Sequence, residues 1–396
     1  MTNMLMNVIH VIYIKRFICL PMVFMCIIIS LYDSVSKPVG LVQLGQSCYM
    51  NSVLQVLYHT KALKEYFQDI NHEDGKILSN VFSCFLREYD QKKRENTKCF
   101  RPESIHNQMQ DISKYYSSEE TYGDGRPHSA HEFFNFVLEK LIEEQKGIEE
   151  DKKVQIGDLF KIVVCSTKQL CSHEHEHRET GNWFYLDLSV SEDEMKNIKK
   201  KRKGCCANCC KKYDLDVKKL IEWYVAPQRL GYGSYGCKKC QKEKAYIMQE
   251  KSNIMSTSKY LILAINATPR DIKKKYNSIF TAPMQLDMAE YISNDNNEND
   301  NKDEKSTKYS LYGVIRHIGF GSYSHYASVV KDGDEWFLCD NNNVTRISKP
   351  IETKIDDTHV ENDLNNNSQV VSYDILSRKY SDVGVVFLYE RVDEQN

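Results

Sequence analysis

The sequence predicts an α+β fold, with helices in the first part of the chain and antiparallel strands in the second. Apolar residues recur with helical spacing up to about residue 145, and a strand-like alternation replaces that spacing from residue 158 onward. The chain has 396 residues, of which 41% are hydrophobic and 27% charged, which indicates a globular protein. The formal net charge of -2 argues against nucleic acid or an acidic membrane surface as a partner.

The clearest predicted helix covers residues 129–145. Ser129 can cap this helix, Glu132 lies three residues later as in a capping box, and the apolar residues that follow form one buried face. A second strong helix candidate, at 76–93, carries a continuous apolar stripe. Further expected elements of this part are a helix at 61–70, a helix that opens at Pro102, and a polar loop at 115–126.

The second part of the chain is expected to consist mainly of strands, because β-branched and aromatic residues alternate there with polar ones. Two low-complexity stretches interrupt it: 293–308, expected to be disordered, and 352–370, expected to be a loop insert. The expected elements are strands at 159–164, 184–190, 245–250, 260–267, within 309–347 and at 384–389, and a helix at 215–224 that Pro227 ends.

An apolar N-terminal segment, residues 1–36, precedes the globular pattern. Residues 17–32 are almost wholly apolar and follow Lys15 and Arg16, but they fall short of the roughly 20 residues that span a bilayer. A signal peptide, a membrane anchor and a wrongly assigned start codon all remain open. As an anchor, this segment would keep the N-terminus in the cytosol and translocate the rest of the chain.

Cys48 is the candidate nucleophile. It follows a loop that contains Gly40 and Gly45, and the residues after it have helical apolar spacing, so it is expected near a helix N-terminus. The partial positive charge at such a terminus favours a thiolate, which a nucleophilic cysteine needs. The alternative is that Cys48 is a small core residue, the commoner fate of a free cysteine.

The stretch from His325 to Asp340 is predicted to form a hairpin. Asp332-Gly333 is a preferred dipeptide for a two-residue type I′ turn, and the resulting register places His325 directly opposite Asp340. Cβ atoms of such a pair are about 5 Å apart, so the carboxylate could orient the imidazole as in a catalytic triad. If Gly333-Asp334 makes the turn instead, the pair shifts by two residues and the contact becomes diagonal. A lone exposed His–Asp pair is the other interpretation.

The fourteen cysteines are crowded, which speaks against a disulfide framework. Two adjacent pairs, Cys205-Cys206 and Cys209-Cys210, lie close together, and Cys237 and Cys240 have the spacing of metal ligands. These features favour a reducing compartment, cytoplasmic or nuclear. That location conflicts with translocation by an N-terminal anchor.

The sequence resembles the ubiquitin-specific proteases, which are papain-like deubiquitinating enzymes, over roughly residues 37–392. Residues 40–57 resemble the Cys box of this family and residues 309–344 its His box. Residues 127–141 resemble the family's helix with the pattern Gln-Gln-Asp-Ala-x-Glu-Phe. The resemblance implies a catalytic domain at 37–393 with a helical thumb at about 40–150, fingers at about 157–255 and a palm at about 256–393.

The resemblance also implies a catalytic mechanism that needs no cofactor. Cys48 would attack the carbonyl after the C-terminal glycine of ubiquitin, His325 would act as base and then as acid, and Asp340 would orient His325. Asn341 would lie nearby as an auxiliary residue. The partners implied are ubiquitin or ubiquitinated proteins, and residues of the helix at 127–141 would line the channel for the ubiquitin tail.

Several positions depart from the family pattern. Gln43 stands where the family has an Asn that donates to the oxyanion; it keeps the amide on a longer arm, so weakening rather than loss is expected. Complete loss of such a donor costs about 10²–10³ in rate. Glu132, Ser129 and Tyr326 are the expected substrate contacts, and Ser129 replaces an Asp of the family pattern.

A structural zinc site is a further implication of the resemblance, because the family often binds zinc through two Cys-x-x-Cys pairs. Cys237 and Cys240 match the second pair, whereas only Cys171 remains of the first. His173 or His175 could replace the missing ligand, since His is a good zinc ligand. The cysteines at 205–210 are alternative donors.

Two further hypotheses remain beside an active deubiquitinase. The chain could be a weakly active or inactive scaffold that binds ubiquitin, or a protease for a ubiquitin-like modifier. All three residues of the expected triad are present, which argues against the scaffold. The replacements at Gln43 and Ser129 keep both alternatives open.

Overall fold

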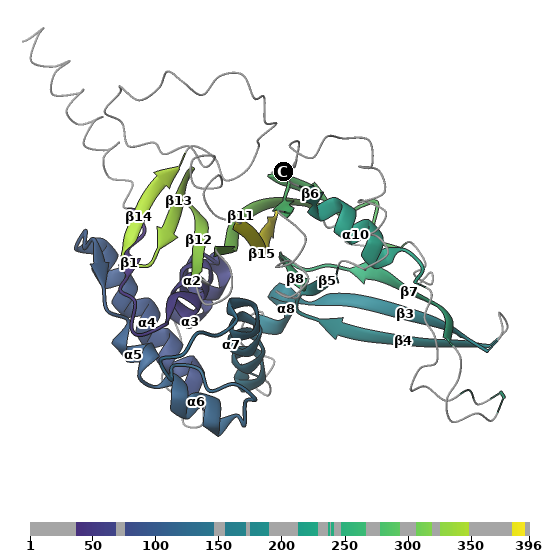
Figure 1. Cartoon of the computed structure of the whole chain (residues 1–396), viewed down its shortest axis with the longest axis horizontal. Coiled ribbons are helices and arrows are strands. Elements are labelled where there is room, and N and C mark those ends of the chain that lie inside the picture. Colours follow the sequence, from purple (N-terminus) through teal and green to yellow (C-terminus); the bar gives the residue numbers. More distant parts are fainter. Residues whose placement is uncertain are drawn as a thin grey trace, which may run out of the picture.

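A computed structural model of the chain describes most of the predicted globular part (Figure 1). The predicted anchor at 17–32, the cysteines at 205–210, the insert at 352–370 and all but the ends of the insert at 293–308 lie outside the described residues. The described residues are 37–68, 76–145, 155–171, 175–189, 213–228, 237, 239–240, 247–266, 278–293, 306–318, 325–347 and 382–392.

The helices of the first part of the chain gather toward one end of the molecule, whereas the helix at 217–225 lies among the strands on the other side, and the predicted α+β class is confirmed (Figure 1). Within the described ranges, no helix is both long enough and apolar enough to cross a lipid bilayer. The helices of the first part are α2 (Cys48–Tyr58), α3 (Lys61–Gln68), α4 (Ile77–Arg94), α5 (Glu103–His106), α6 (Met109–Tyr115), α7 (Ala130–Gln145) and α8 (Ile156–Phe160).

The ends of the two longest helices are stabilised in different ways. Ser129 accepts a hydrogen bond from the Glu132 backbone N–H over 3.3 Å, so the predicted cap of α7 is present. The first turn of α4 is capped from a distance: the Glu144 carboxylate, near the end of α7, accepts from the N–H groups of Leu78 and Ser79 over 2.9 and 2.7 Å. This contact connects α4 to α7, and no local sequence pattern predicts it.

The main sheet places the predicted His-bearing hairpin beside the helices (Figure 1). Its strands pair antiparallel except for β5 and β8, which pair in parallel. The strand order is β14 (Asn343–Ile347), β13 (Glu335–Asp340), β12 (His325–Asp332), β11 (Lys308–Ile318), β15 (Asp382–Arg391), β8 (Tyr260–Asn266) and β5 (Leu186–Ser189), with β10 (Gln285–Asp287) paired to β11.

A second, three-stranded antiparallel sheet extends away from the helices (Figure 1). It consists of β4 (Glu176–Trp183), β3 (Ile162–Leu170) and β7 (Ile247–Ser256) in that order. Two short parallel pairs complete the described fold: β1 (Gly40–Leu41) with β2 (Cys99–Phe100), and β6 (Tyr213–Asp216) with β9 (Ser278–Thr281). Strand β6 leads directly into helix α10 (Val217–Val225).

Two predicted boundaries are wrong. Leu159 and Phe160 end helix α8 instead of starting a strand, because Phe160 stacks on Tyr260 of β8, 5.4 Å between ring centroids. The helix expected from Leu215 starts at Val217. Asp216 caps it by accepting from the Lys218 N–H, and the preceding residues pair with β9.

The predicted register of the hairpin is also wrong. Asp332 pairs with Glu335, so Gly333 and Asp334 form the turn, and Gly333 has a φ of +61°. This register places Val330 opposite Phe337, and both side chains are fully buried in the core beside the helices. The predicted register would instead have set Val330 opposite a glutamate.

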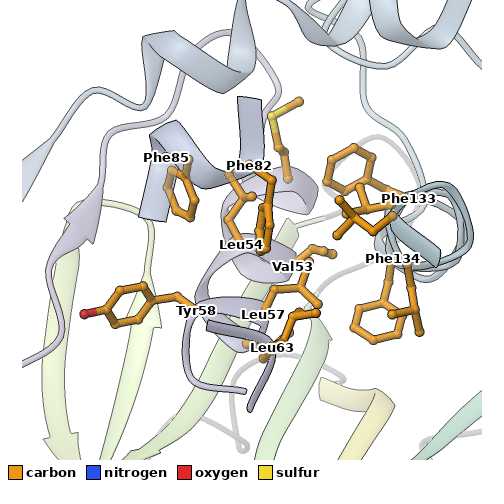
Figure 2. Close-up of a cluster of buried hydrophobic side chains, with 14 of the residues drawn as sticks. Val53, Leu54, Leu57, Tyr58, Leu63, Phe82, Phe85, Phe133 and Phe134 are labelled. Atoms are coloured by element: carbon orange, nitrogen blue, oxygen red, sulfur yellow. The ribbon is translucent and has the colours of Figure 1, made fainter. Parts of the chain in front are cut away.

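The hydrophobic core on the helical side is built around α2, which is buried along its whole length. Figure 2 shows aromatic side chains of α4 and α7 lying on either side of the Val53 and Leu54 side chains of α2. Phe133 of α7 is fully buried and packs edge-on against Tyr49 and Tyr122, with centroid distances of 5.3 and 5.0 Å. The segment that carries Cys48 therefore rests on a close-packed base.

Truncation of this base should lower the stability of the fold. We expect Phe133→Ala to cost about 3–5 kcal/mol, because it removes buried contacts and leaves a cavity. Tyr115→Ala removes an aromatic ring that is 59% exposed and should change stability little. Urea unfolding followed by circular dichroism measures both variants; equal losses would contradict the assignment of Phe133 to the core.

Candidate active site

Cys48 is the first residue of α2 and is 4% exposed. The loop before it is shaped by glycines: Gly45 has a φ of +63°, and a Cβ on Gly40 would lie 2.6 Å from the carbonyl oxygen of Asn342. The side chain of Ser47 holds this loop by accepting from the Leu44 N–H over 2.8 Å. Cys48 therefore lies at a helix N-terminus, where negative charge on the sulfur is favoured.

His325 and Asp340 make the predicted contact in spite of the different register. Nε2 of His325 lies 2.7 Å from Oδ1 of Asp340, although the two residues are diagonal and not directly opposite. His325 starts β12 and Asp340 ends β13, so both side chains lie at the open end of the hairpin. A diagonal pair is within reach of long side chains.

The imidazole of His325 interacts with both Asp340 and Cys48. The pKa of His325 is raised to about 10: the hydrogen bond to Asp340 contributes most, the hydrogen bond to Cys48 is second, and burial opposes them. The imidazole therefore keeps its proton through neutral pH. The imidazole thus links the Cys48 thiol to the Asp340 carboxylate, as in a Cys–His–Asp triad.

Three amide side chains connect helix α2 and the loop before Cys48 to the turn after Asp340. Nδ2 of Asn51, one turn after Cys48, donates to Oδ1 of Asn341 over 2.9 Å, and Nδ2 of Asn341 donates to Oε1 of Gln43 over 3.0 Å. Asn341 has a left-handed backbone with a φ of +50°, which Asn tolerates better than most residues. Because Asn341 follows Asp340, the amide chain links the carboxylate to the loop of Cys48.

The Gln43 amide is held at both ends. Its carbonyl accepts from Asn341, and its NH2 group donates to the backbone oxygen of Gly45 over 2.9 Å. An NH2 group carries two donors, and the Gly45 carbonyl takes one of them. The side chain is thus fixed beside the loop of Cys48.

Helix α2 also holds strand β1, which leads into this loop. Nδ2 of Asn51 donates to the Leu41 carbonyl over 3.1 Å, and Nε2 of Gln55 donates to the Val39 carbonyl over 2.7 Å. Asn51 and Gln55 are about one helical turn apart, and the carbonyls of Leu41 and Val39 are two residues of extended chain apart. Both separations are about 6 Å, so each donor reaches its own carbonyl. No role is predicted for Asn51 from the sequence; its only signal is that it is one of a few polar residues in a mainly apolar helix.

Basic side chains at the C-terminal ends of α2 and α4 lie beside the far end of β12. Nζ of Lys93 lies 2.5 Å from Oδ2 of Asp332, and Nε2 of His59 lies 3.8 Å from the same oxygen. Burial alone would raise the pKa of Asp332, but His59 and Lys93 lower it to about 2. The hairpin is therefore anchored to the helices at the end opposite to His325.

The predicted substrate contacts lie around the N-terminus of α7. The hydroxyl of Tyr326 forms hydrogen bonds with the Ala130 backbone and the Ser129 side chain. Glu132 is exposed, and its pKa is raised, first by burial and then by the charge of Glu120. The structure thus brings Ser129 and Tyr326 together next to His325, with Glu132 one turn away.

The predicted metal ligands come together at the end of the three-stranded sheet. The sulfur atoms of Cys171, Cys237 and Cys240 lie within 4.8 Å of one another. Nδ1 of His175 lies 3.4 Å from the sulfur of Cys237 and 3.2 Å from that of Cys240. His173 and the cysteines at 205–210 lie outside the described residues. His175 therefore lies beside the cluster of three cysteines and contacts two of its sulfur atoms.

The pKa of His325 provides a direct test of the geometry. We expect Asp340→Asn to lower it from about 10 toward the ordinary value of 6.5, because the largest contribution is removed. Titration of the imidazole by NMR on histidine-labelled protein measures the change. Asp334→Asn, at the exposed turn of the same hairpin, is the matched control. An imidazole that titrates near 6.5 in the unmodified protein would refute the contact.

Curated relatives with similar sequences are ubiquitin carboxyl-terminal hydrolases. Ubiquitin carboxyl-terminal hydrolase 17 of Arabidopsis thaliana is 28% identical, and the match covers 78% of this chain and 39% of the relative. Hydrolase 16 of the same plant is 23% identical over 78% of this chain and 28% of its own length. Human hydrolase 22 is 24% identical over 78% of this chain and 62% of its own length. The chain therefore spans well under half the length of the two plant relatives.

The family comparison agrees with these matches. Residues 39–373 match the family model described as ubiquitin carboxyl-terminal hydrolase. The matched range contains Cys48, His325 and Asp340, and it extends over most of the chain. The chain belongs to the ubiquitin carboxyl-terminal hydrolase family.

Proposed function

We propose that the chain is a deubiquitinating cysteine protease that hydrolyses the bond after the C-terminal glycine of ubiquitin. One observation carries the proposal: His325 forms hydrogen bonds with both Cys48 and Asp340, and Cys48 lies at a helix N-terminus. In this proposal the helical part forms the thumb, the three-stranded sheet the fingers and the large sheet the palm. The partners are ubiquitin or ubiquitinated proteins.

The proposed reaction has two steps. The sulfur of Cys48 attacks the carbonyl carbon, and the bond to the leaving amine breaks as His325 transfers its proton to the nitrogen. A thioester with ubiquitin results. In the second step His325 takes a proton from water, the hydroxide attacks the thioester, and Cys48 is released. Asp340 stabilises the charged imidazole and holds its orientation throughout.

Gln43 is the proposed donor to the oxyanion that forms in each step. Asn341 holds its carbonyl end, which supports a defined direction for the NH2 group beside Cys48. Because the Gly45 carbonyl takes one donor, the second donor serves the oxyanion. A preorganised donor of this kind contributes about 10²–10³ in rate. Asn341 acts through Gln43 and is a positioning residue.

A probe experiment tests the function. We expect ubiquitin with a C-terminal electrophile to label the unmodified protein covalently and to leave Cys48→Ala unlabelled, because the probe needs the thiolate. Mass spectrometry detects the adduct. Cys84→Ala, which removes a cysteine of α4 away from the site, should label like the unmodified protein.

The same probes separate the alternatives. An unmodified protein that binds ubiquitin without reacting would support the scaffold hypothesis. Preferential reaction with a probe made from a ubiquitin-like modifier would support the third hypothesis, which the replacement of an Asp of the family pattern by Ser129 keeps open. The first result would overturn the proposed reaction, and the second would overturn the proposed substrate.

We further propose that Cys171, Cys237, Cys240 and His175 hold a structural zinc ion. Three thiolates and one imidazole are a common tetrahedral donor set for zinc, with ligand atoms about 3.6–3.8 Å apart. The three sulfur atoms lie within 4.8 Å of one another, and Nδ1 of His175 lies within 3.4 Å of two of them, which supports this set. A zinc ion there would stabilise the end of the three-stranded sheet and take no part in the reaction.

Metal analysis tests the zinc proposal. We expect about one zinc per purified chain and a much lower content in Cys237→Ser and His175→Ala, since each variant removes a ligand. Cys165→Ser, on strand β3 outside the cluster, should retain the metal. Elemental mass spectrometry after dialysis measures the content. A zinc-free protein, or full zinc content in His175→Ala, would contradict the proposed ligands.

We also propose a reducing compartment, cytoplasmic or nuclear, for this protein. The described cysteines are free thiols, and the proposed nucleophile and zinc ligands must stay reduced to act. Association with nucleic acid has no support in the net charge of -2. Association with a membrane through residues 17–32 stays a prediction.

A further inference from the structure

His128 occupies an unusual position in the loop between α6 and α7. Its side chain is only 7% exposed. Nδ1 lies 3.1 Å from Oε2 of Glu120, and Nε2 lies 2.9 Å from Oδ1 of Asp124. The rings of Tyr49 and Tyr122 pack edge-on against the imidazole, each with a centroid distance of 5.2 Å.

Each ring nitrogen of this imidazole faces a different carboxylate of the same loop. Ionised carboxylates only accept hydrogen bonds, so Glu120 and Asp124 are acceptors for the imidazole. Burial alone would raise the pKa of Asp124, but the hydrogen bond from His128 lowers it. The imidazole of His128 therefore bridges two carboxylates of its own loop.

The same loop closes against the segment that carries the candidate nucleophile. The Gly123 N–H donates to the hydroxyl of Tyr49 over 3.0 Å, and Tyr49 directly follows Cys48. A Cβ on Gly45 would lie 3.2 Å from the Cα atom of Gly125, so the two backbones are nearly in contact. The position of the loop is thus coupled to the segment around Cys48.

On its other side, His128 directly precedes the cap of α7. Ser129 follows it in the chain and forms a hydrogen bond with Tyr326. Both residues are among the proposed contacts of the ubiquitin tail. A shift of His128 would therefore move the proposed tail contacts together with the loop.

We propose that His128 is a positioning residue: paired with Glu120 and Asp124, it holds the loop at 117–127 closed against Tyr49 and sets the affinity for the ubiquitin tail. The family pattern Gln-Gln-Asp-Ala-x-Glu-Phe has its second glutamine at this position, so the latch formed by His128, Glu120 and Asp124 is a property of this chain. The effect on tail affinity rests on the proposed function. The closure of the loop does not, and it can be measured without activity.

Two readouts test the proposal. Hydrogen exchange followed by mass spectrometry reports on the loop peptides, and steady-state kinetics with ubiquitin carrying a C-terminal fluorogenic amide report on KM and kcat. In His128→Gln we expect faster exchange at 117–127 and a KM raised about tenfold, the factor that one charge-assisted hydrogen bond carries at the low end of its range. The kcat should stay within about twofold, because Cys48, His325 and Asp340 are untouched.

Further variants distinguish the latch from a general loss of packing. Asp124→Asn should change both readouts in the same direction, and combining it with His128→Gln should add little, because both changes break one interaction. Asp111→Asn on α6 removes a carboxylate that is 86% exposed and is the matched control. If His128→Gln does not fold, Asp124→Asn, whose side chain is 19% exposed, carries the test alone.

Each outcome decides between the hypotheses. Unchanged loop exchange in a folded His128→Gln or Asp124→Asn variant, or fully additive effects in the double variant, would overturn the latch. A change in kcat with an unaltered KM would overturn its role in tail affinity. If the unmodified protein does not hydrolyse the probe, the proposed function fails, and loop exchange still decides on the latch while the Kd for ubiquitin replaces KM.

Discussion

The site depends on the packing of helix α2 along strand β12, because each element carries one reacting group at the same end. Cys48 starts α2 and His325 starts β12, and the two elements run side by side in the core. An 11-residue helix is about 16 Å long, so a small rotation at its far end would displace the sulfur noticeably. Lys93 of α4 pairs with Asp332 at the end of β12, and His59 at the C-cap of α2 lies 3.8 Å from the same carboxylate oxygen. A partly buried ion pair is a weak source of stability, and its effect here is to fix the position of β12 against the ends of these helices.

The turn between β13 and β14 adds a second constraint, because it links the carboxylate to the loop of Cys48. Asn341 contacts both Asn51 and Gln43, and the Leu41 N–H donates to the Asn341 carbonyl over 2.9 Å. The Gly40 backbone approaches the same turn so closely that any side chain would displace it. The family's Asn is replaced by a longer Gln in this chain, and Asn341 holds the longer side chain in place.

Most helices and strands could be predicted because their apolar periodicity is strong and local. The errors lie where a distant contact overrides the local pattern. Phe160 ends a helix, where its ring stacks on Tyr260. The hairpin register pairs Val330 with Phe337, and both side chains are buried in the core beside the helices. Turn chemistry alone favoured Asp332-Gly333, whereas the pairing of Asp332 with Lys93 keeps this residue in the strand.

The sequence by itself determined the fold class, the resemblance to a protease family, and the residue types of the proposed triad and of three proposed metal ligands, since these depend on composition, periodicity and short motifs. Only the tertiary structure decided which residues support them. His175 lies beside the proposed metal ligands, Asn51 reaches Asn341 across 290 positions of the chain, and His128 lies between two carboxylates. The physical reason is that hydrogen bonds and ion pairs between distant segments depend on how those segments pack, and no local pattern in the sequence records that packing.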